Sequence, residues 1–210
     1  MNGYVGRVIS CGLTHEGEPI AIYALTARSA VSKARVLISK SDGLWVEPTS
    51  DLQGGDPSLL YYRASFRQNH KLFIANGMHS ERFVDSTSIE SALQDEIYEP
   101  DEPIFTPRIA AVFDLEALSY SFASLTRSPD GSCKRSFTHF NDLKAGVAHR
   151  IQTYEGDVQN PRAFVDPPIA YTLPSTNIGQ TIFDQLDPTL RIALAVIRSD
   201  GYELINTQGA

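Results

Sequence analysis

The sequence predicts an α+β protein in which antiparallel strands predominate. Apolar runs of strand length occur in both halves of the 210-residue chain, and turn signals such as Asn76-Gly77 and Ser128-Pro129-Asp130-Gly131 lie between them. Two stretches with helical spacing lie among these runs. We therefore expect helices that pack against the faces of antiparallel sheets.

The first part of the chain predicts a hairpin followed by a loop and a strand. Apolar residues over 5–9 and 20–25 flank a polar turn that contains Gly17, a pattern typical of two paired strands. Glycine and proline make residues 40–58 a predicted loop with a short strand around Trp45. A further strand is expected over residues 71–75.

The middle of the chain predicts one helix and several strands. Thr87 and Glu90 have the spacing of a capping box, and apolar residues at helical spacing continue to Ile97 before Pro100 ends the helix. Strands are predicted over 108–113, 118–125 and 135–140. Residues 147–154 fit either a strand or a helix.

The last part of the chain predicts a second helical region. A helical segment is expected over residues 178–186. Asp187 followed by Pro188 then has the form of a helix start, and Leu190, Leu194 and Ile197 would form its buried stripe. An edge strand over residues 202–205 completes the prediction.

Composition limits the classes of partner. The net charge of −7 argues against broad binding to nucleic acid, which requires a basic face. No apolar run approaches the roughly 20 residues that cross a bilayer, and the amino terminus does not have the pattern of a secretory leader. We therefore expect a soluble, cytoplasmic protein with one domain over residues 1–210, without nucleic-acid or membrane partners.

The two cysteines indicate neither a disulfide framework nor a zinc site. Cys11 and Cys133 lie far apart and without CxxC spacing. Buried free thiols are the simpler interpretation. The sequence therefore predicts no metal centre.

One local cluster of cations could meet an anionic ligand. Arg28, Lys33 and Arg35 lie close together after the second predicted strand, beside the hydroxyl groups of Thr26 and Ser29. Guanidinium groups offer a planar fork of donors that suits phosphate. A solvated surface loop is the competing interpretation, and these residues alone slightly favour it.

An acidic, proline-rich stretch precedes the strand predicted over residues 108–113. It contains three acids, three prolines and Arg108. Proline biases the residue before it toward extended geometry, so Glu102 is predicted to be held in place. Glu102 and Arg108 are then candidates for polar groups fixed at the edge of a core. The competing interpretation is a solvated connection between elements.

Several short strings, taken in order, resemble the archaeal-type IMP cyclohydrolase family. They are Tyr4-Val5-Gly6-Arg7, Arg28-Ser29, Tyr62, Asn76-Gly77-Met78-His79, Tyr98-Glu99-Pro100-Asp101-Glu102 and Thr106-Pro107-Arg108-Ile109-Ala110-Ala111. Each string is short, so their shared order carries the resemblance. Further on, the match is limited to Thr153-Tyr154-Glu155, and no residue of the carboxy-terminal third aligns with the family's late lysine.

The resemblance implies a fold similar to that of N-terminal nucleophile hydrolases, a four-layer α-β-β-α sandwich with two stacked antiparallel sheets. Those hydrolases expose a Cys, Ser or Thr at a processed amino terminus, where its own amine acts as base. The chain opens Met1-Asn2-Gly3-Tyr4, so we expect this mechanism to be absent.

The resemblance also implies an enzyme of de novo purine biosynthesis. Its substrate would be 5-formamido-imidazole-4-carboxamide ribonucleotide, whose carboxamide nitrogen attacks the formyl carbon and loses water to give inosine monophosphate. Such an intramolecular cyclisation needs orientation, proton transfer and stabilisation of an oxyanion. It requires no metal and no cofactor.

Three residues are candidates for catalysis on this interpretation. Glu102 would accept the proton, Tyr62 would donate a hydrogen bond to the formyl oxygen or the leaving water, and Arg108 would stabilise the oxyanion. Tyr62 is equally well explained as a core aromatic residue. Arg108 is also explained by pairing with a neighbouring acid.

Candidates for substrate binding come from two parts of the chain. Arg28 and Ser29, with Arg35 or Lys33, would hold the 5′-phosphate. Asn76 and His79 would contact the carboxamide or the ribose, although a single histidine after a turn is more often structural or exposed.

Two alternatives differ from this interpretation in function. One is a homologue on the same scaffold that acts on another amide or cyclic amide, since one fold hosts several activities. The other is a non-catalytic module that binds purine nucleotides. The joint presence of Tyr62, Glu102 and Arg108 favours catalysis. A homo-oligomer is compatible with the sequence.

Overall fold

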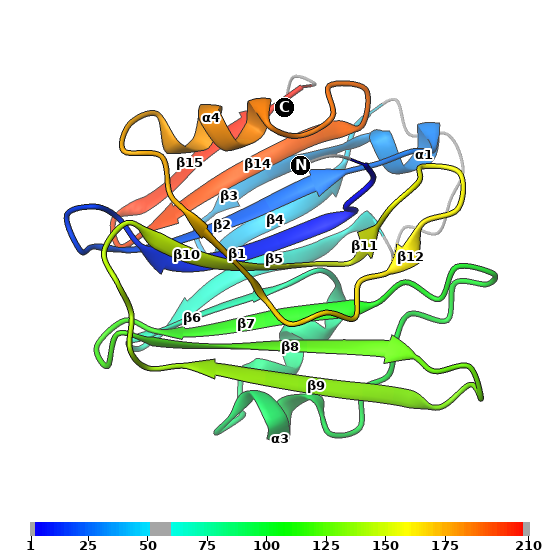
Figure 1. Ribbon diagram of the computed structural model, residues 1–210, viewed down its shortest axis with the longest axis horizontal. Helices are drawn as coiled ribbons and strands as arrows, with labels where there is room; N and C mark the ends of the chain where they lie inside the picture. The colour runs from blue at the N-terminus through cyan, green and yellow to red at the C-terminus, as the bar shows by residue number, and fades with distance from the viewer. Residues whose placement is uncertain (1–2, 51–59, 208–210) are drawn as a thin grey trace.

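The computed structural model describes residues 3–50 and 60–207 and consists mainly of two large antiparallel sheets (Figure 1). The six-stranded sheet has the order β13 (Ile169–Thr172), β10 (Val147–Gln152), β1 (Arg7–Leu13), β2 (Pro19–Thr26), β14 (Arg191–Arg198) and β15 (Gly201–Asn206).

The seven-stranded sheet follows the chain without a crossover. Its order is β3 (Arg35–Lys40), β4 (Gly43–Pro48), β5 (Tyr62–Gln68), β6 (Lys71–Ala75), β7 (Arg108–Asp114), β8 (Ser119–Arg127) and β9 (Cys133–Phe140). A small third sheet pairs β11 (Tyr154–Glu155) with β12 (Arg162–Ala163).

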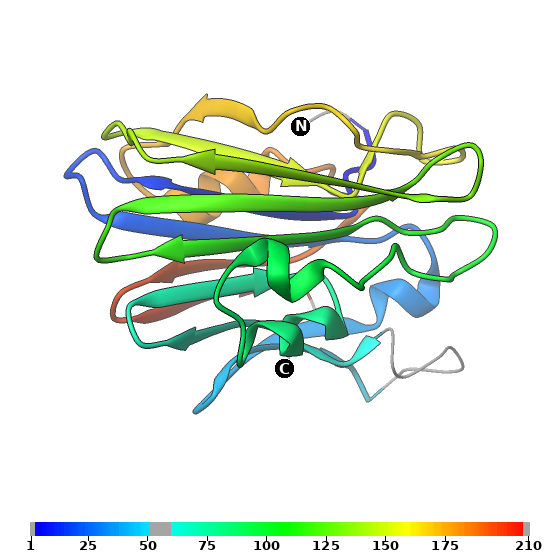
Figure 2. The same ribbon diagram turned by 90° about the horizontal axis from the view of Figure 1, so that it is seen from below.

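The helical elements are short. They are α1 (Ala30–Lys33), the 3₁₀ helix η1 (Met78–Phe83), α3 (Ile89–Leu93) and α4 (Ile178–Asp184). Figure 1 shows α4 on the outer side of the six-stranded sheet and α3 on the outer side of the seven-stranded sheet. Figure 2 shows α3 and its neighbouring turns lying across the strands of the latter.

The alternation of side chains along the strands explains this layering. Ile9 on β1 packs in one cluster with Leu44 and Phe113 of the other sheet, so the main core lies between the sheets. Val8, the residue before Ile9 on β1, points to the opposite face and packs with Ile182 of α4. A third cluster packs η1 and α3 on the seven-stranded sheet.

Most of the predicted strands are confirmed. The amino-terminal hairpin pairs β1 with β2, and the strand predicted over residues 71–75 is β6. Residues 147–152, which fitted either period, form β10. Residues 51–58 of the predicted loop lie outside the described residues, as do Met1 and Asn2.

The prediction of a helix that starts at Asp187 is wrong. Residues 191–198 form β14, whose neighbours are β2 and β15. Both faces of this strand are covered: Ala195 packs between the sheets, and Leu194 packs under α4. A strand buried on both faces is apolar throughout, so it lacks the alternation that distinguishes a strand from a helix.

The helix predicted to run to Ile97 is shorter than expected. The helix α3 ends at Leu93, and its capping box joins Ser88 with Ser91 rather than Thr87 with Glu90. Ile97 is exposed and belongs to no buried stripe. The segment 94–107 is therefore free to form the irregular loop that enters the site.

Among the described residues, no helix combines the length and apolar character needed to span a bilayer.

Candidate active site

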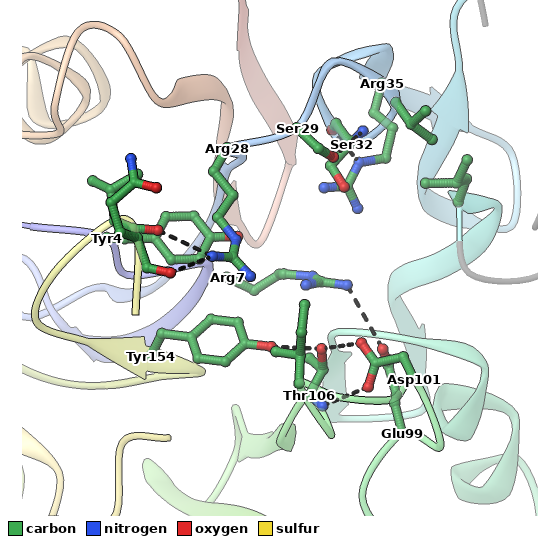
Figure 3. Close-up of a pocket in the computed structure, with 15 residues that line it drawn as sticks. Tyr4, Arg7, Arg28, Ser29, Ser32, Arg35, Glu99, Asp101, Thr106 and Tyr154 are labelled. Carbon is green, nitrogen blue, oxygen red and sulfur yellow. Dashed lines mark hydrogen bonds and ion pairs between the residues drawn. The ribbon is translucent and has the colours of Figure 1, made fainter. Parts of the chain in front are cut away.

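A cavity of about 580 Å³ opens at one end of the stacked sheets. It lies where the segment before β1, the turn around α1, the loop 99–106 and β11 meet, on the right-hand side of Figure 1. These segments are far apart in the sequence, and strand pairing brings them together. Figure 3 shows that one wall carries guanidinium groups and the opposite wall carries carboxyl groups.

Three arginines supply the positive wall. Arg7 and Arg35 are buried, and Arg28 is half-buried beside them. Burial lowers the pKa of Arg35, and the nearby charge of Arg7 lowers it further. Within residues 3–50 and 60–207, neither Arg28 nor Arg35 forms an ion pair with a carboxylate. Their charges are therefore available to an anionic ligand.

Backbone groups hold these arginines in place. Arg28 donates from Nη1 to the carbonyl oxygens of Val158 and Gln159 at 3.1 and 3.2 Å. Arg35 donates from Nε to the Ser32 carbonyl at 2.8 Å, which leaves its terminal nitrogens for the cavity. Ser29 caps α1 by accepting a hydrogen bond from the Ser32 amide. This local turn thus presents two hydroxyl groups beside two guanidinium groups.

The start of β1 aims Arg7 into the cavity. Arg7 shares the face of β1 that carries Ile9, so its side chain enters the space between the sheets at their end. Gly6 precedes it with a φ of 68°, a conformation that favours glycine, and a Cβ there would overlap Thr153 Oγ1. Glycine at position 6 therefore permits the approach of this segment to β11.

The negative wall comes from a closed loop before β7. The Glu99 amide donates to the Thr106 carbonyl at 2.9 Å. Asp101 accepts from the Thr106 amide at 2.6 Å and from the Thr106 hydroxyl at 2.5 Å. These bonds turn Glu99 and Asp101 toward the cavity and leave Glu102 in solvent.

Glu99 is the buried acid of this wall. Its Oε2 lies 3.9 Å from Nη2 of Arg7, and the residue is 5% exposed. Burial raises the pKa of Glu99 to about 7, although the charge of Arg7 acts in the opposite direction. A carboxyl group with a pKa near neutrality is suited to exchange protons with a substrate.

Tyr154 completes the wall beside Asp101. Its hydroxyl lies 2.6 Å from Oγ1 of Thr106. Because the Thr106 hydroxyl donates to Asp101, Tyr154 donates to Thr106. The ring of Tyr154 stacks on Tyr4 at a centroid distance of 5.4 Å, and Arg28 lies over the Tyr4 ring. The cavity thus includes an aromatic surface next to the cationic wall.

The sequence-predicted binding residues are placed in two groups. Arg28, Ser29 and Arg35 line the cavity. Asn76 and His79 are buried behind its acidic wall and do not line it. Asn76 donates to the Pro107 carbonyl and accepts from the Ile109 amide, so its side chain fixes the start of β7.

The sequence-predicted catalytic residues do not line the cavity. Glu102 is exposed. The Tyr62 side chain is fully buried, and its hydroxyl lies 2.7 Å from the Tyr23 hydroxyl. Arg108 pairs with Glu96 on the far side of the loop. The structure therefore does not bring these three side chains together.

Sequence reasoning overlooked several residues that the cavity gathers. They are Tyr4, Arg7, Ser32, Glu99, Asp101, Thr106 and Tyr154. Most of them stand in the strings that carried the family resemblance. Arg7 had a further signal, because it is the only charged residue of β1. A charge in a strand that is otherwise mostly apolar indicates a polar function.

No group of three or more His, Cys, Asp or Glu side chains with the geometry of a metal site occurs in the described part of the chain. The cavity itself offers guanidinium, hydroxyl, carboxyl and aromatic groups. These groups suit an anionic, planar organic molecule with exchangeable protons.

Known proteins resemble this chain in sequence. The sequence profile of a family described as IMP cyclohydrolase-like protein matches residues 4–202. A protein of Methanococcus aeolicus named IMP cyclohydrolase is 26% identical over 162 residues, which cover 72% of this chain and 74% of that protein. The range that matches the family profile, residues 4–202, includes every residue that lines the cavity.

Proposed function

The chain belongs to the family of IMP cyclohydrolase-like proteins, and from this premise we propose how its cavity closes a purine ring. The protein is a cyclohydrolase of purine biosynthesis. Its substrate is 5-formamido-imidazole-4-carboxamide ribonucleotide, and its product is inosine monophosphate. One observation carries the assignment of roles: two guanidinium groups that have no carboxylate partner among the described residues share a single cavity with one buried carboxyl group.

The cationic end holds the 5′-phosphate. Arg28 and Arg35 supply the charge, and the Ser29 and Ser32 hydroxyls add donors. Guanidinium binds phosphate through paired hydrogen bonds of fixed geometry. The planar base then extends from the phosphate along the stacked rings of Tyr4 and Tyr154. This orientation brings the carboxamide and the formamido group to the acidic wall.

Glu99 transfers the proton. As the carboxamide nitrogen attacks the formyl carbon, the ionised Glu99 takes one proton from that nitrogen. The electrons of the formyl double bond move onto its oxygen, and Arg7 stabilises the negative charge. Glu99 returns the proton to this oxygen. The resulting hydroxyl group then leaves as water together with the proton of the formamido nitrogen, and the C=N bond forms.

These roles replace three of the sequence-based assignments. Glu99 takes the part of Glu102, because of these two glutamates only Glu99 lines the cavity. Arg7 takes the part of Arg108, which is paired with Glu96 outside the cavity. Arg7 also takes the part of hydrogen-bond donor given to Tyr62, whose hydroxyl is enclosed with that of Tyr23, because the Tyr154 hydroxyl already donates to Thr106.

We propose the finer fold and the cellular setting on the same grounds. Helix α4, the two sheets, and η1 with α3 pack in succession, which supports the four-layer sandwich of N-terminal nucleophile hydrolases. We include a single domain over residues 1–210, a cytoplasmic location and a possible homo-oligomer. The small-molecule substrate is a free nucleotide, with no requirement for a metal or a cofactor.

An ultraviolet assay tests the function. The purified protein is mixed with the formamido ribonucleotide in the presence of a chelator, and formation of inosine monophosphate is followed by absorbance. We expect turnover. If the nucleotide raises the melting temperature without turning over, the chain is a binding module instead. If only another cyclic amide is converted, the scaffold performs a different reaction.

A further inference from the structure

His79 is a buried, neutral side chain, and one of its ring nitrogens can accept a hydrogen bond. The residue is 2% exposed, and its Nε2 lies 3.2 Å from the Ile109 carbonyl oxygen. A carbonyl only accepts, so Nε2 carries the proton and Nδ1 presents a lone pair. Burial and the charge of Arg108 lower the pKa of His79 to about 3, so the ring is neutral at ordinary pH. Nδ1 has no hydrogen-bond partner among the described residues.

This nitrogen and Glu99 both lie beside Gly77. A Cβ on Gly77 would lie 3.1 Å from Glu99 Oε1 and 3.4 Å from His79 Nδ1. Gly77 has extended backbone with a φ of −179°, so conformational freedom does not explain the glycine. A side chain at this position would lie against both atoms, so the glycine leaves them room to approach each other.

The two oxygens of Glu99 therefore have different surroundings. Oε2 faces the guanidinium group of Arg7, which favours a negative oxygen. Oε1 lies near His79 Nδ1, whose lone pair repels a negative oxygen and can accept a hydrogen bond from a protonated one. When Glu99 is protonated in the ligand-free protein, the proton belongs on Oε1.

We propose that His79 is the positioning residue of Glu99: the protonated carboxyl group closes the gap above Gly77 and donates its Oε1 hydrogen to His79 Nδ1. The bond satisfies a buried acceptor that has no other partner in the described part of the chain. It also leaves Oε2, beside Arg7, as the oxygen that faces the cavity. The catalytic consequence rests on the proposed role of Glu99, whereas the bond itself can be tested without substrate.

The charged groups around Glu99 and His79 determine in which direction the pKa of Glu99 should shift. Arg7 and Arg35 favour the ionised form of Glu99, and Asp101 favours the protonated form. His79 faces the charges of Arg108 and Arg7, which oppose its own protonation. Glu99 thus titrates beside a neutral imidazole ring. A hydrogen bond to the neutral form of an acid raises its pKa.

The first test replaces His79 by Gln. The amide of His79→Gln can still donate to the Ile109 carbonyl, but it has no atom at the place of Nδ1. The Glu99 carboxyl is followed by ¹³C NMR in ligand-free protein and assigned by its loss in Glu99→Gln. We expect the titration midpoint to fall by about one pH unit, the effect of one hydrogen bond. His139→Gln, at an exposed histidine, should leave it unchanged.

The second test needs no variant at His79. The ¹⁵N resonance of Nδ1 should move as Glu99 titrates while it stays in the range of a neutral ring, and this movement should vanish in Glu99→Gln. An Nδ1 resonance that ignores the titration of Glu99 would overturn the proposal, and so would equal midpoints in wild type and folded His79→Gln. Both readouts stand if the ring-closure assay fails, so the two proposals are separable.

Discussion

Oε2 of Glu99 lies 3.9 Å from Nη2 of Arg7, and both side chains are almost wholly buried. Proximity to a cation ordinarily holds the pKa of a carboxyl group down, but burial outweighs it here and raises the pKa of Glu99 to about 7. The pair therefore combines a cation that remains charged with an acid that changes protonation state near neutral pH.

The two glutamates of the loop before β7 should differ sharply in their effect on catalysis. Glu99→Gln keeps the shape of the side chain but cannot accept a proton, so we expect kcat to fall by roughly two to four decades. Glu102→Gln alters an exposed side chain of the same loop and should leave kcat within about threefold of wild type. Steady-state kinetics measure both. The reverse pattern would return the proton transfer to Glu102.

The activity of the enzyme should depend on pH through Glu99. The proposed base is active when ionised, so kcat/KM should be low in acid and rise through a midpoint of about pH 7. Glu99→Gln should abolish this rise, whereas Glu102→Gln should retain it. A wild-type profile that is flat between about pH 5 and 8 would contradict the role of Glu99 as base.

The stability of the fold should fall as pH rises, whereas the activity should rise. The pKa of Glu99 is about 7 in the folded protein and near 4.5 without the fold, so the folded state binds more protons between these values. Glu99 therefore costs nothing in stability below pH 4.5, and its cost grows as pH rises through 7. The full cost is about 3 kcal/mol for such a shift.

Urea denaturation of wild type and Glu99→Gln at several pH values measures this effect. The free energy of unfolding of wild type, relative to the variant, should fall by about 3 kcal/mol between pH 4.5 and 8. A constant difference across this range would show that the carboxyl group is not desolvated as its burial indicates.

The phosphate assignment predicts a change in binding rather than in rate. Arg28→Ala removes a guanidinium group that lies at the cavity without a carboxylate partner among the described residues. We expect KM to rise by roughly 10- to 100-fold, the value of one charge-assisted contact, with little change in kcat. Lys33→Ala changes a charge in the same turn that does not line the cavity and should leave KM unaltered. Equal effects of both variants would refute a specific phosphate site.

The strand β14 shows where sequence periodicity reaches its limit. The pattern of β6 and β7 identified them as strands, and their edges agree with the prediction to within a residue or so. Residues 192–197 are all buried because one sheet packs on one face and α4 on the other. Which faces are covered is a property of the assembled layers, and the local pattern does not contain it.

The acidic loop shows the same limit at the site. The sequence located the right segment, since Glu99, Asp101 and Thr106 lie in two of the strings that resemble the family. It did not identify which acid faces the cavity. That choice is made by the hydrogen bonds of Thr106 to Glu99 and Asp101, which close the loop with Glu102 outside. Such closure depends on three-dimensional contacts rather than on residue type.

The two buried or half-buried arginines near this loop allow the oxyanion role to be tested by a matched pair of substitutions. Arg7→Lys shortens the reach of the cation toward the substrate, so we expect kcat to fall by roughly 10- to 100-fold while the fold persists. Arg108 instead pairs with Glu96, which also accepts from Arg82 at 2.7 Å.

Arg108→Lys should therefore lower the melting temperature, because the ion pair of Arg108 with Glu96 anchors the loop. It should leave kcat within about threefold of wild type, because neither residue lines the cavity. Thermal unfolding and steady-state kinetics of both variants separate the two roles. A large loss of kcat in Arg108→Lys, with normal rates in Arg7→Lys, would assign oxyanion stabilisation to Arg108. In that case the loop would have to rearrange when substrate binds, since Arg108 faces Glu96 in the free protein.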